Sequence, residues 1–222
     1  MAADVTGKQK RDMREINFKV ALFDLDGVVF DTESQYTIFW GGQCRKYHPE
    51  IPGLEHTIKG QTLVQIFDKY FADVKSEQPL IVKQLHDFER NMDYRYIAGL
   101  TDYISHIKSL GVKTAIVTSS NKDKMEAVSK VHPELNDYFD AIFTSEDFER
   151  SKPDPDCYLK GASYFGVDSA DCVVFEDSFN GLKAGRAANM RVVGLATTNA
   201  AADIKPYADI VINDFTELKD LV

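Results

Sequence analysis

Two aspartates, Asp24 and Asp26, stand two residues apart at the end of a short apolar run, KVALF, at residues 19–23. Carboxylates with few other protein ligands suit Mg²⁺, which keeps several waters and shares oxygens with phosphate groups. A carboxylate can also attack phosphorus and form an aspartyl-phosphate. The pair therefore suits phosphoryl transfer, provided that groups able to bind a cation and a phosphate lie near it.

Such groups follow the later apolar runs of the chain. Thr118 ends the second run, Lys152 follows the third in the loop SKPDP, and Glu176 and Asp177 end the fourth. In an open parallel sheet, ligands bind beyond the carboxyl ends of the strands, so these side chains are expected at one edge of the sheet. They would provide carboxylates for a hard cation, and a hydroxyl and an ammonium for an anion. Catalysis in such a site rests mostly on positioning and electrostatic stabilisation.

The elements that must position these groups alternate along the chain. Continuous apolar runs are typical of strands buried on both faces of a parallel sheet, and six are present: 19–23, 114–118, 140–143, 172–176, 191–196 and 209–212. Between them we predict helices with apolar stripes: Tyr103, Ile107 and Leu110; Met125, Val128 and Val131; and Tyr158, Leu159, Ala162 and Phe165. Gly111 and Gly166 are expected to end the first and third helices, and Pro155 to open the third. This order predicts a doubly wound, Rossmann-like α/β sheet with right-handed crossovers.

The segment 31–97, called the inserted segment below, breaks this alternation because it contains no convincing strand. Thr32-x-x-Gln35 and Thr62-x-x-Gln65 are capping-box patterns, and each precedes an apolar helical stripe. A third stripe comprises Ile81, Leu85, Phe88 and Met92. We therefore predict a helical cap domain at 31–97, inserted into an α/β core formed by 16–30 and 98–222, with a polar, disordered leader at 1–15.

Composition disfavours several classes of partner. The formal net charge of -9 argues against a nucleic-acid or anionic membrane surface, which would require a basic face. No apolar run approaches the roughly 18 residues of a membrane span, and the N-terminus lacks the apolar core of a secretion signal. Three cysteines at irregular spacing indicate reduced thiols, so a cytoplasmic protein is expected. The histidine spacing favours no metal site. We expect a monomer that acts on a small molecule.

Four motifs occur in order: FDLDGVVFDT (23–32), AIVTSS (115–120), SKPDP (151–155) and FEDSFNG (175–181). With these motifs at expected strand ends and a helical insertion between the first two, the sequence resembles the haloacid dehalogenase-like superfamily of phosphotransferases. It is most similar to the β-phosphoglucomutase-like sugar-phosphate phosphatases with a helical cap. The resemblance covers nearly the whole chain after about residue 16.

The resemblance implies a role for each motif residue. Asp24 would attack phosphorus in line and become aspartyl-phosphate. Asp26 would act first as general acid on the leaving oxygen and then as general base on water. Thr118 and Lys152 would hold the phosphoryl oxygens, and Lys152 would also pair with Asp24.

The resemblance also implies a Mg²⁺ site and a substrate-facing loop. The expected metal residues are Asp24, Asp26 through its backbone carbonyl, Asp177, and Glu176 as a direct or indirect ligand. We expect loop 57–64 to face the leaving group and to set specificity together with the loop after Thr118. The substrate-binding candidates are Lys59, Gln61, Thr62, Ser119, Ser120 and Asn121. Asp31 and Glu33 are interpreted as part of the turn and helix start, without a chemical role.

Relatives of this subgroup include mutases, which hold a second phosphate with a cap arginine where this chain has Leu63. Mutases also carry a histidine where it has Tyr36, and the pair Asn121-Lys122 stands in the reverse order. These departures favour a phosphatase, with a β-phosphoglucomutase-type isomerase or an inorganic pyrophosphatase as alternatives. A phospho-receiver signalling domain also places acids, a threonine and a lysine at strand ends, but the helical insertion and the acid pair 176–177 argue against it.

Overall fold

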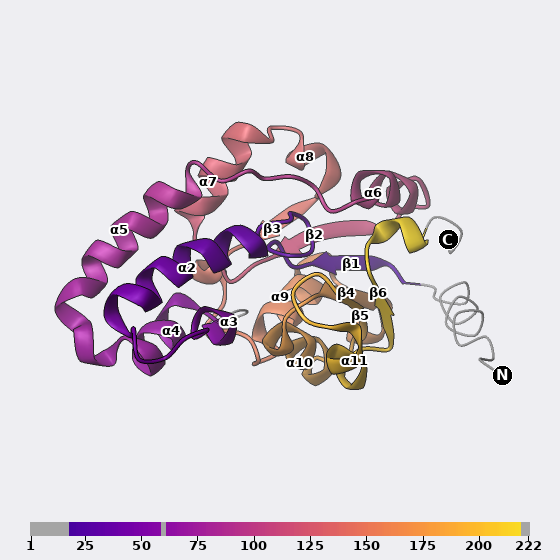
Figure 1. Cartoon of the computed structure of the whole chain (residues 1–222). Coiled ribbons are helices and arrows are strands. Elements are labelled where there is room, and N and C mark those ends of the chain that lie inside the picture. Colours follow the sequence, from indigo (N-terminus) through magenta and orange to yellow (C-terminus); the bar gives the residue numbers. More distant parts are fainter. Residues whose placement is uncertain (1–17, 59–60, 219–222) are drawn as a thin grey trace.

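The computed structural model describes residues 18–58 and 61–218, so the expected leader at 1–15 and the candidate Lys59 lie outside the described residues. Its centre is a parallel six-stranded sheet in the order β3-β2-β1-β4-β5-β6 (Figure 1). The strands are β1 (Val20–Phe23), β2 (Lys113–Val117), β3 (Ala141–Phe143), β4 (Cys172–Glu176), β5 (Arg191–Leu195) and β6 (Ile210–Ile212). All six predicted strands are therefore present, and the α/β fold class is confirmed.

Different helices cover the two faces of the sheet. In β1, Ala21 and Phe23 pack into one hydrophobic cluster, whereas Val20 and Leu22 pack into the other. The first cluster includes α6 (Leu100–Ser109), α7 (Lys122–Val131) and α8 (Leu135–Tyr138), and the second includes α9 (Asp156–Phe165), α10 (Phe179–Ala187) and α11 (Ala201–Ile204). Because both faces are covered, the strands are apolar throughout rather than alternating. This is the doubly wound arrangement that the sequence predicted.

The predicted helix ends agree with the structure better than the predicted stripes. Gly111 and Gly166 follow α6 and α9 with φ of 86° and 67°, a conformation that favours glycine. Leu110, Val131 and Leu159 are exposed, however, at 57%, 57% and 42%. Leu110 lies past the last residue of α6, and Val131 is the last residue of α7. Leu159 points away because the sheet-facing side of α9 is formed by its neighbours.

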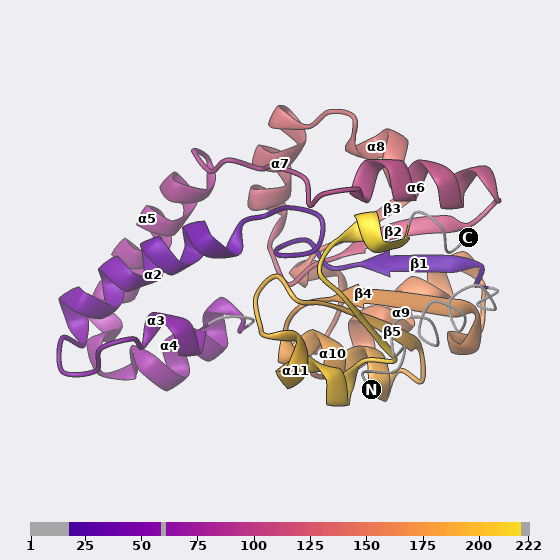
Figure 2. The same cartoon turned by 45° about the vertical axis from the view of Figure 1, so that its right-hand side comes forward.

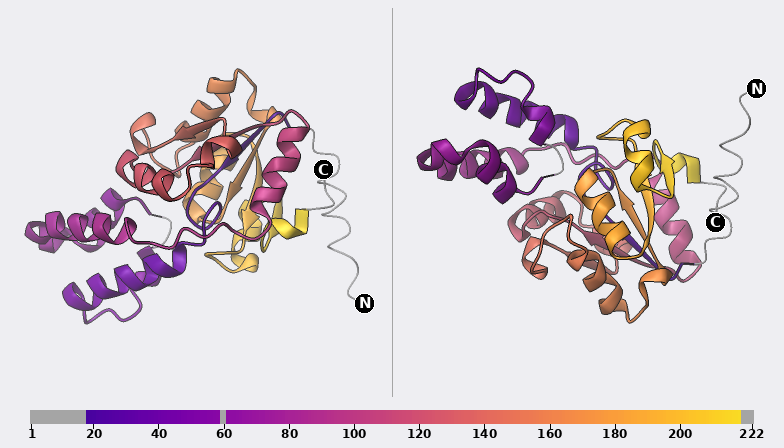
Figure 3. Two further views of the ribbon diagram at one scale, coloured as in Figure 1. Left: turned by 90° about the horizontal axis from the view of Figure 1, so that it is seen from above. Right: turned by 90° about the horizontal axis from the view of Figure 1, so that it is seen from below.

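In its described residues, 31–58 and 61–97, the inserted segment forms four helices, α2 (Glu33–Tyr47), α3 (Glu55–Ile58), α4 (Leu63–Tyr70) and α5 (Gln78–Glu89), with a 3₁₀ turn at Ala72–Glu77. They lie on the side to which the arrowhead of β1 points, and they project away from the sheet (Figures 2 and 3). A separate hydrophobic cluster joins them: Trp40, Cys44, Leu54, Ile58, Ile66, Phe71, Ile81 and Leu85. Met92 was expected in the third stripe, but it lies beyond α5 and packs with the sheet cluster.

The two connections between the sheet and the inserted segment are paired with each other. Phe30 and Tyr96 form an antiparallel bridge, and the backbone N–H of Asp31 donates to the carbonyl of Arg95 at 2.8 Å. The amide of Gln35 adds two bonds to the backbone of Asp93, one donated to its carbonyl at 2.8 Å and one accepted from its N–H at 2.9 Å. The connections therefore run as one paired unit into the inserted segment.

Residues 18–58 and 61–218 include no helix with the length and apolarity required to cross a bilayer.

Candidate active site

The chain leaves β1 through a turn that only glycine fits. The backbone N–H of Asp24 donates to the Phe175 carbonyl at 3.0 Å, which continues the pairing of β1 with β4. Gly27 then has φ of 77°, and a Cβ atom at this position would collide with the carboxylate of Asp177. The turn thus brings the backbone after β1 against the acid that follows β4. These two strands are neighbours at the point where the strand order reverses, the usual ligand position in such sheets.

Lys152 lies at the centre of the buried charges. Its ammonium donates to Asp24 Oδ1 at 2.5 Å, to Glu176 Oε1 at 2.8 Å and to the Val117 carbonyl at 3.0 Å, and its side chain is 4% exposed. All three donors of the ammonium are therefore used. Burial alone would lower the pKa of Lys152, but the carboxylates of Asp24 and Glu176 raise it well above its usual value. The lysine therefore stays charged.

Glu176 is held by five donors. Its Oε1 accepts from Lys152 and from the Tyr158 hydroxyl at 3.1 Å, and its Oε2 accepts from the N–H groups of Asp177 and Ser178, both at 2.9 Å, and from the Ser178 hydroxyl at 3.0 Å. The carboxylate is fully buried. A group whose acceptor sites are already filled suits the positioning of Lys152 better than direct metal coordination.

Three carboxylates form a cluster suited to a hard cation. One carboxylate oxygen each of Asp24, Glu176 and Asp177 lies within 4.8 Å of the other two, and the Glu176 oxygens already accept hydrogen bonds, so Glu176 adds its charge to the cluster. Burial raises the pKa of Asp24 to about 7, although Lys152 opposes the rise. Burial and the charge of Glu176 raise the pKa of Asp177 well above its usual value. Because burial and mutual repulsion disfavour these charges, a divalent cation with oxygen preference fits this donor set.

Asp26 accepts hydrogen bonds from three elements. Thr32 donates to its Oδ1 at 2.6 Å, and Lys124 and Ser120 approach its Oδ2 at 2.5 Å and 3.3 Å. The predicted capping box at Thr32 is therefore wrong, since the threonine hydroxyl is committed to Asp26 and makes no cap bond to α2. The second capping box, between Thr62 and Gln65, is confirmed.

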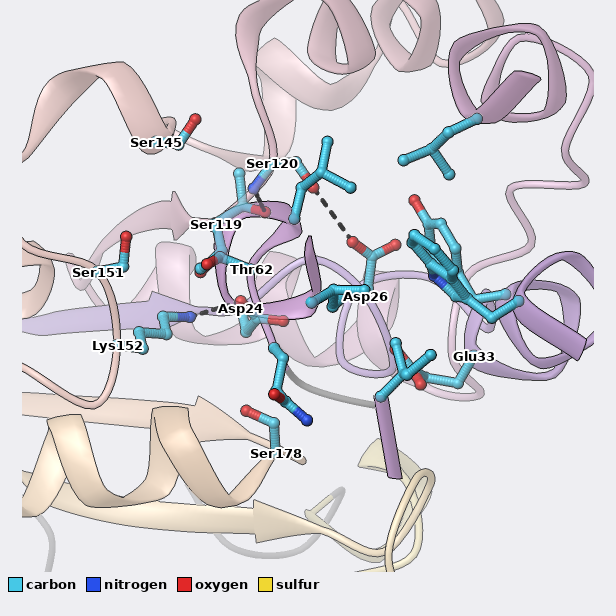
Figure 4. A pocket seen from close by; sticks show the side chains of 18 of the residues that line it. Asp24, Asp26, Glu33, Thr62, Ser119, Ser120, Ser145, Ser151, Lys152 and Ser178 are labelled. Carbon is cyan, nitrogen blue, oxygen red and sulfur yellow. Dashed lines mark hydrogen bonds and ion pairs between the residues drawn. The ribbon is translucent and has the colours of Figure 1, made fainter. Parts of the chain in front are cut away.

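A single cavity of about 470 Å³ connects these groups with the inserted segment (Figure 4). The predicted site residues that line it are Asp24, Asp26, Gln61, Thr62, Thr118, Ser119, Ser120, Asn121, Lys152, Glu176 and Asp177. Their sequence positions span both the sheet and the inserted segment. The structure thus brings together every predicted site residue that it describes. Ser145, Ser151 and Ser178 also line the cavity, although their side chains were not singled out.

The end of the cavity formed by the inserted segment is acidic and aromatic. The carboxylates of Glu33, Glu55 and Glu89 line it, together with Tyr36 and Trp40. Among the lining residues that the structure describes, Lys152 at the opposite end is the sole lysine or arginine. Glu33, interpreted from sequence as a helix start only, thus faces the cavity, and its charge adds to the raised pKa of Asp177.

Sequence reasoning missed Lys124, the buried cation beside Asp26. Its side chain is 1% exposed. Lys124 precedes Val128 by one helical turn, so it shares the buried side of α7, and this spacing was the available signal. Its partner Asp26 is 98 residues away in sequence, which no local pattern specifies.

Comparisons with known proteins agree with this geometry. A family model described as "Haloacid dehalogenase-like hydrolase" matches residues 21–195. The bifunctional riboflavin kinase/FMN phosphatase of Arabidopsis thaliana is 29% identical over 205 residues, which cover 89% of this chain and 54% of that protein. The chain therefore spans about half the length of this relative.

Two further similarities extend over nearly complete chains. The validoxylamine A 7'-phosphate phosphatase of Streptomyces hygroscopicus subsp. limoneus is 27% identical over 210 residues, covering 91% of this chain and 96% of that protein. The crystal structure of a β-phosphoglucomutase from Clostridium difficile has a TM-score of 0.73 at 21% identity, covering 91% of this chain and 94% of that chain. The latter similarity establishes a shared fold.

Proposed function

The chain belongs to the haloacid dehalogenase-like hydrolase family, and from this premise we propose that it is a Mg²⁺-dependent phosphatase of a small phosphate monoester, such as a sugar phosphate. One observation carries the proposal: Asp24, paired with Lys152 at 2.5 Å, shares a cavity with the acid cluster and with the inserted segment. A nucleophile, a fixed cation and a metal-binding set around one space are the parts that phosphoryl transfer requires.

The proposed reaction has two steps at phosphorus. In the first, a carboxylate oxygen of Asp24 forms a bond to phosphorus while the bond to the leaving oxygen breaks, and Asp26 gives that oxygen a proton. In the second, Asp26 takes a proton from a water molecule, which attacks phosphorus and breaks the bond to Asp24. Thr118 holds a phosphoryl oxygen throughout, and Lys152 does so with the N–H that it donates to Asp24 in the substrate-free protein. Mg²⁺, held by Asp24, Asp177 and the carbonyl of Asp26, would neutralise charge on the phosphoryl group.

The composition of the cavity supports hydrolysis over the mutase alternative. A mutase must hold a second phosphate at the leaving-group end, where this cavity presents Leu63 and the carboxylates of Glu33, Glu55 and Glu89. Carboxylates that line this end of the cavity repel a phosphate and disfavour its binding there. We therefore propose that the leaving group is uncharged.

We further propose that residues 31–97 act as a cap domain over a core of 16–30 and 98–222. The hydrophobic cluster that joins α2 to α5, separate from the two sheet clusters, supports this division. Closure of such a segment would exclude bulk water from the cavity. The three cysteines are free and buried, which supports the proposed cytoplasmic location.

A phosphate-release screen tests the proposed function. Purified protein with Mg²⁺ would be assayed against β-glucose 1-phosphate, glucose 6-phosphate, nucleoside monophosphates, FMN and pyrophosphate, with an EDTA control for each. We expect release of phosphate from at least one monoester and no conversion of β-glucose 1-phosphate into glucose 6-phosphate. Isomerisation without release, or cleavage of pyrophosphate alone, would replace the proposal by one of its alternatives.

Mg²⁺ is expected to stabilise the protein more at pH 8 than at pH 5. Folding raises the pKa of Asp24 to about 7 and also raises that of Asp177. Protonation of these carboxyl groups stabilises the metal-free fold. The contribution is fully present at a pH below their ordinary pKa near 4, and for Asp24 it is lost as the pH rises through about 7. Because Mg²⁺ competes with that proton, the increase in melting temperature on adding Mg²⁺ should be at least about 5 °C larger at pH 8.

The control for this measurement is Asp177→Asn, which should lose most of the increase at pH 8. Equal increases at both pH values in the unmodified protein would show that Mg²⁺ does not bind the buried carboxylates.

A further inference from the structure

Lys124 occupies a position that helix stability does not explain. It lies in the first turn of α7, where its own N–H donates to the capping Asn121 side chain at 2.9 Å. A positive side chain near a helix N-terminus opposes the helix dipole, and removing an ammonium from water costs several kcal/mol unless it is paired. The partner that offsets both costs is Asp26, whose Oδ2 lies 2.5 Å from the Lys124 ammonium.

The inserted segment holds the other side of this ammonium. The ring of Tyr36, from α2, lies with its centroid 4.8 Å from Lys124 Nζ. The Tyr36 hydroxyl donates to Glu89 Oε1 at 2.8 Å, and Glu89 ends α5 with 8% exposure. Burial raises the pKa of Glu89, and the charge of Lys124 opposes the rise. Lys124 therefore stands between a carboxylate of the core and a carboxylate of the inserted segment.

The contacts of Asp26 set the direction of its carboxylate. Thr32 fixes Oδ1, while Lys124 and Ser120 fix Oδ2. Lys124 is the ionised donor of the three, so its contact adds the attraction between an ammonium and a carboxylate to the hydrogen bond. Loss of this contact would leave the orientation of Asp26 to two hydroxyl groups.

We propose that Lys124 is a positioning residue that orients Asp26 for proton transfer. Tyr36 and Glu89 hold Lys124 in place, so the inserted segment controls the orientation of Asp26. The proposal rests on the phosphatase function and adds a specific consequence. The step that depends on Lys124 is the donation of a proton to the leaving oxygen. A leaving group of low basicity needs little protonation, so its release should depend little on Lys124.

The test compares Lys124→Met with the unmodified protein on p-nitrophenyl phosphate and phenyl phosphate. The two leaving groups are similar in size and differ mainly in basicity. The value of kcat/KM reports the steps up to transfer to Asp24, so it isolates leaving-group protonation from later hydrolysis of the phosphoenzyme. We expect kcat/KM to fall about 30-fold or more for phenyl phosphate and less than about 3-fold for p-nitrophenyl phosphate, since general acid catalysis contributes about 10²- to 10⁴-fold.

Two further variants make the comparison decisive. Lys130→Met removes an exposed lysine from the same helix and should change neither value. Glu89→Gln keeps an acceptor for the Tyr36 hydroxyl but removes the negative charge that faces Lys124. It should also lower kcat/KM for phenyl phosphate more than for p-nitrophenyl phosphate, by a smaller factor than Lys124→Met does. It also provides the measurement if Lys124→Met does not fold.

Equal losses on both substrates, or no loss on either, would overturn the role of Lys124. That outcome would not contradict the proposed phosphatase function, because that function is tested by phosphate release from the unmodified protein.

Discussion

Replacing Asp24 with asparagine is expected to lower phosphate release by at least about 10⁴-fold, because the amide oxygen is a poor nucleophile and losses of this size or larger accompany removal of a catalytic nucleophile. The side chain keeps its size, and Lys152 retains its bonds to Glu176 and the Val117 carbonyl. The fold should therefore survive. The measurement is phosphate release together with mass spectrometry of acid-quenched protein, in which the unmodified chain should gain one phosphoryl group and Asp24→Asn none.

The matched control is Asp31→Asn, which changes an exposed aspartate at the start of the inserted segment that is not part of the cavity lining. It should retain nearly full activity. Phosphate release that persists in Asp24→Asn, or a phosphoryl group found on another residue, would contradict the assignment of the nucleophile.

Replacing Lys152 with methionine is expected to damage both stability and turnover. The change leaves two buried carboxylates, Asp24 and Glu176, without their cation, and breaking a buried pair in this way costs about 3–5 kcal/mol. Loss of a charged donor to the phosphoryl group should lower kcat by at least about 10²-fold. Urea unfolding in EDTA would measure the first effect, and steady-state phosphate release the second.

Lys160→Met provides the comparison, since Lys160 is an exposed lysine on α9, outside the cavity lining. It should change the free energy of unfolding by less than about 0.5 kcal/mol. If Lys152→Met unfolded at the same urea concentration as the unmodified protein, the buried network around Glu176 would not contribute to stability as described.

Much of the site could be predicted from sequence because each group follows a strand. Asp24, Thr118 and Asp177 come at or just after the ends of apolar runs, and parallel strands bring those ends to one edge of a sheet. Lys152 is farther from its strand and could be placed only through the motif SKPDP. The helix stripes were predicted less well, because periodicity identifies a face but not where the helix stops packing against the sheet.

The features that sequence could not predict depend on contacts across the fold. The Thr32 pattern matches a capping box, but its hydroxyl lies within reach of Asp26 only because the chain turns back after Gly27. Lys124 has the spacing of a buried position, yet a lysine is ordinarily read as exposed unless its partner is known. That partner becomes visible only when α7 is packed beside the end of β1.

The paired connections at Phe30–Tyr96 and Gln35–Asp93 have a mechanical consequence. If the two connections were independent of each other, the inserted segment could rotate and translate in several directions relative to the sheet. Because the connections are hydrogen-bonded to each other, bending between the sheet and the segment is restricted to one axis. We therefore expect the inserted segment to rotate about a single hinge relative to the sheet. Tyr36 and Glu89 would move with the segment in this rotation. The same hinge rotation would then control both the entry of substrate into the cavity and the orientation of Asp26 for proton transfer.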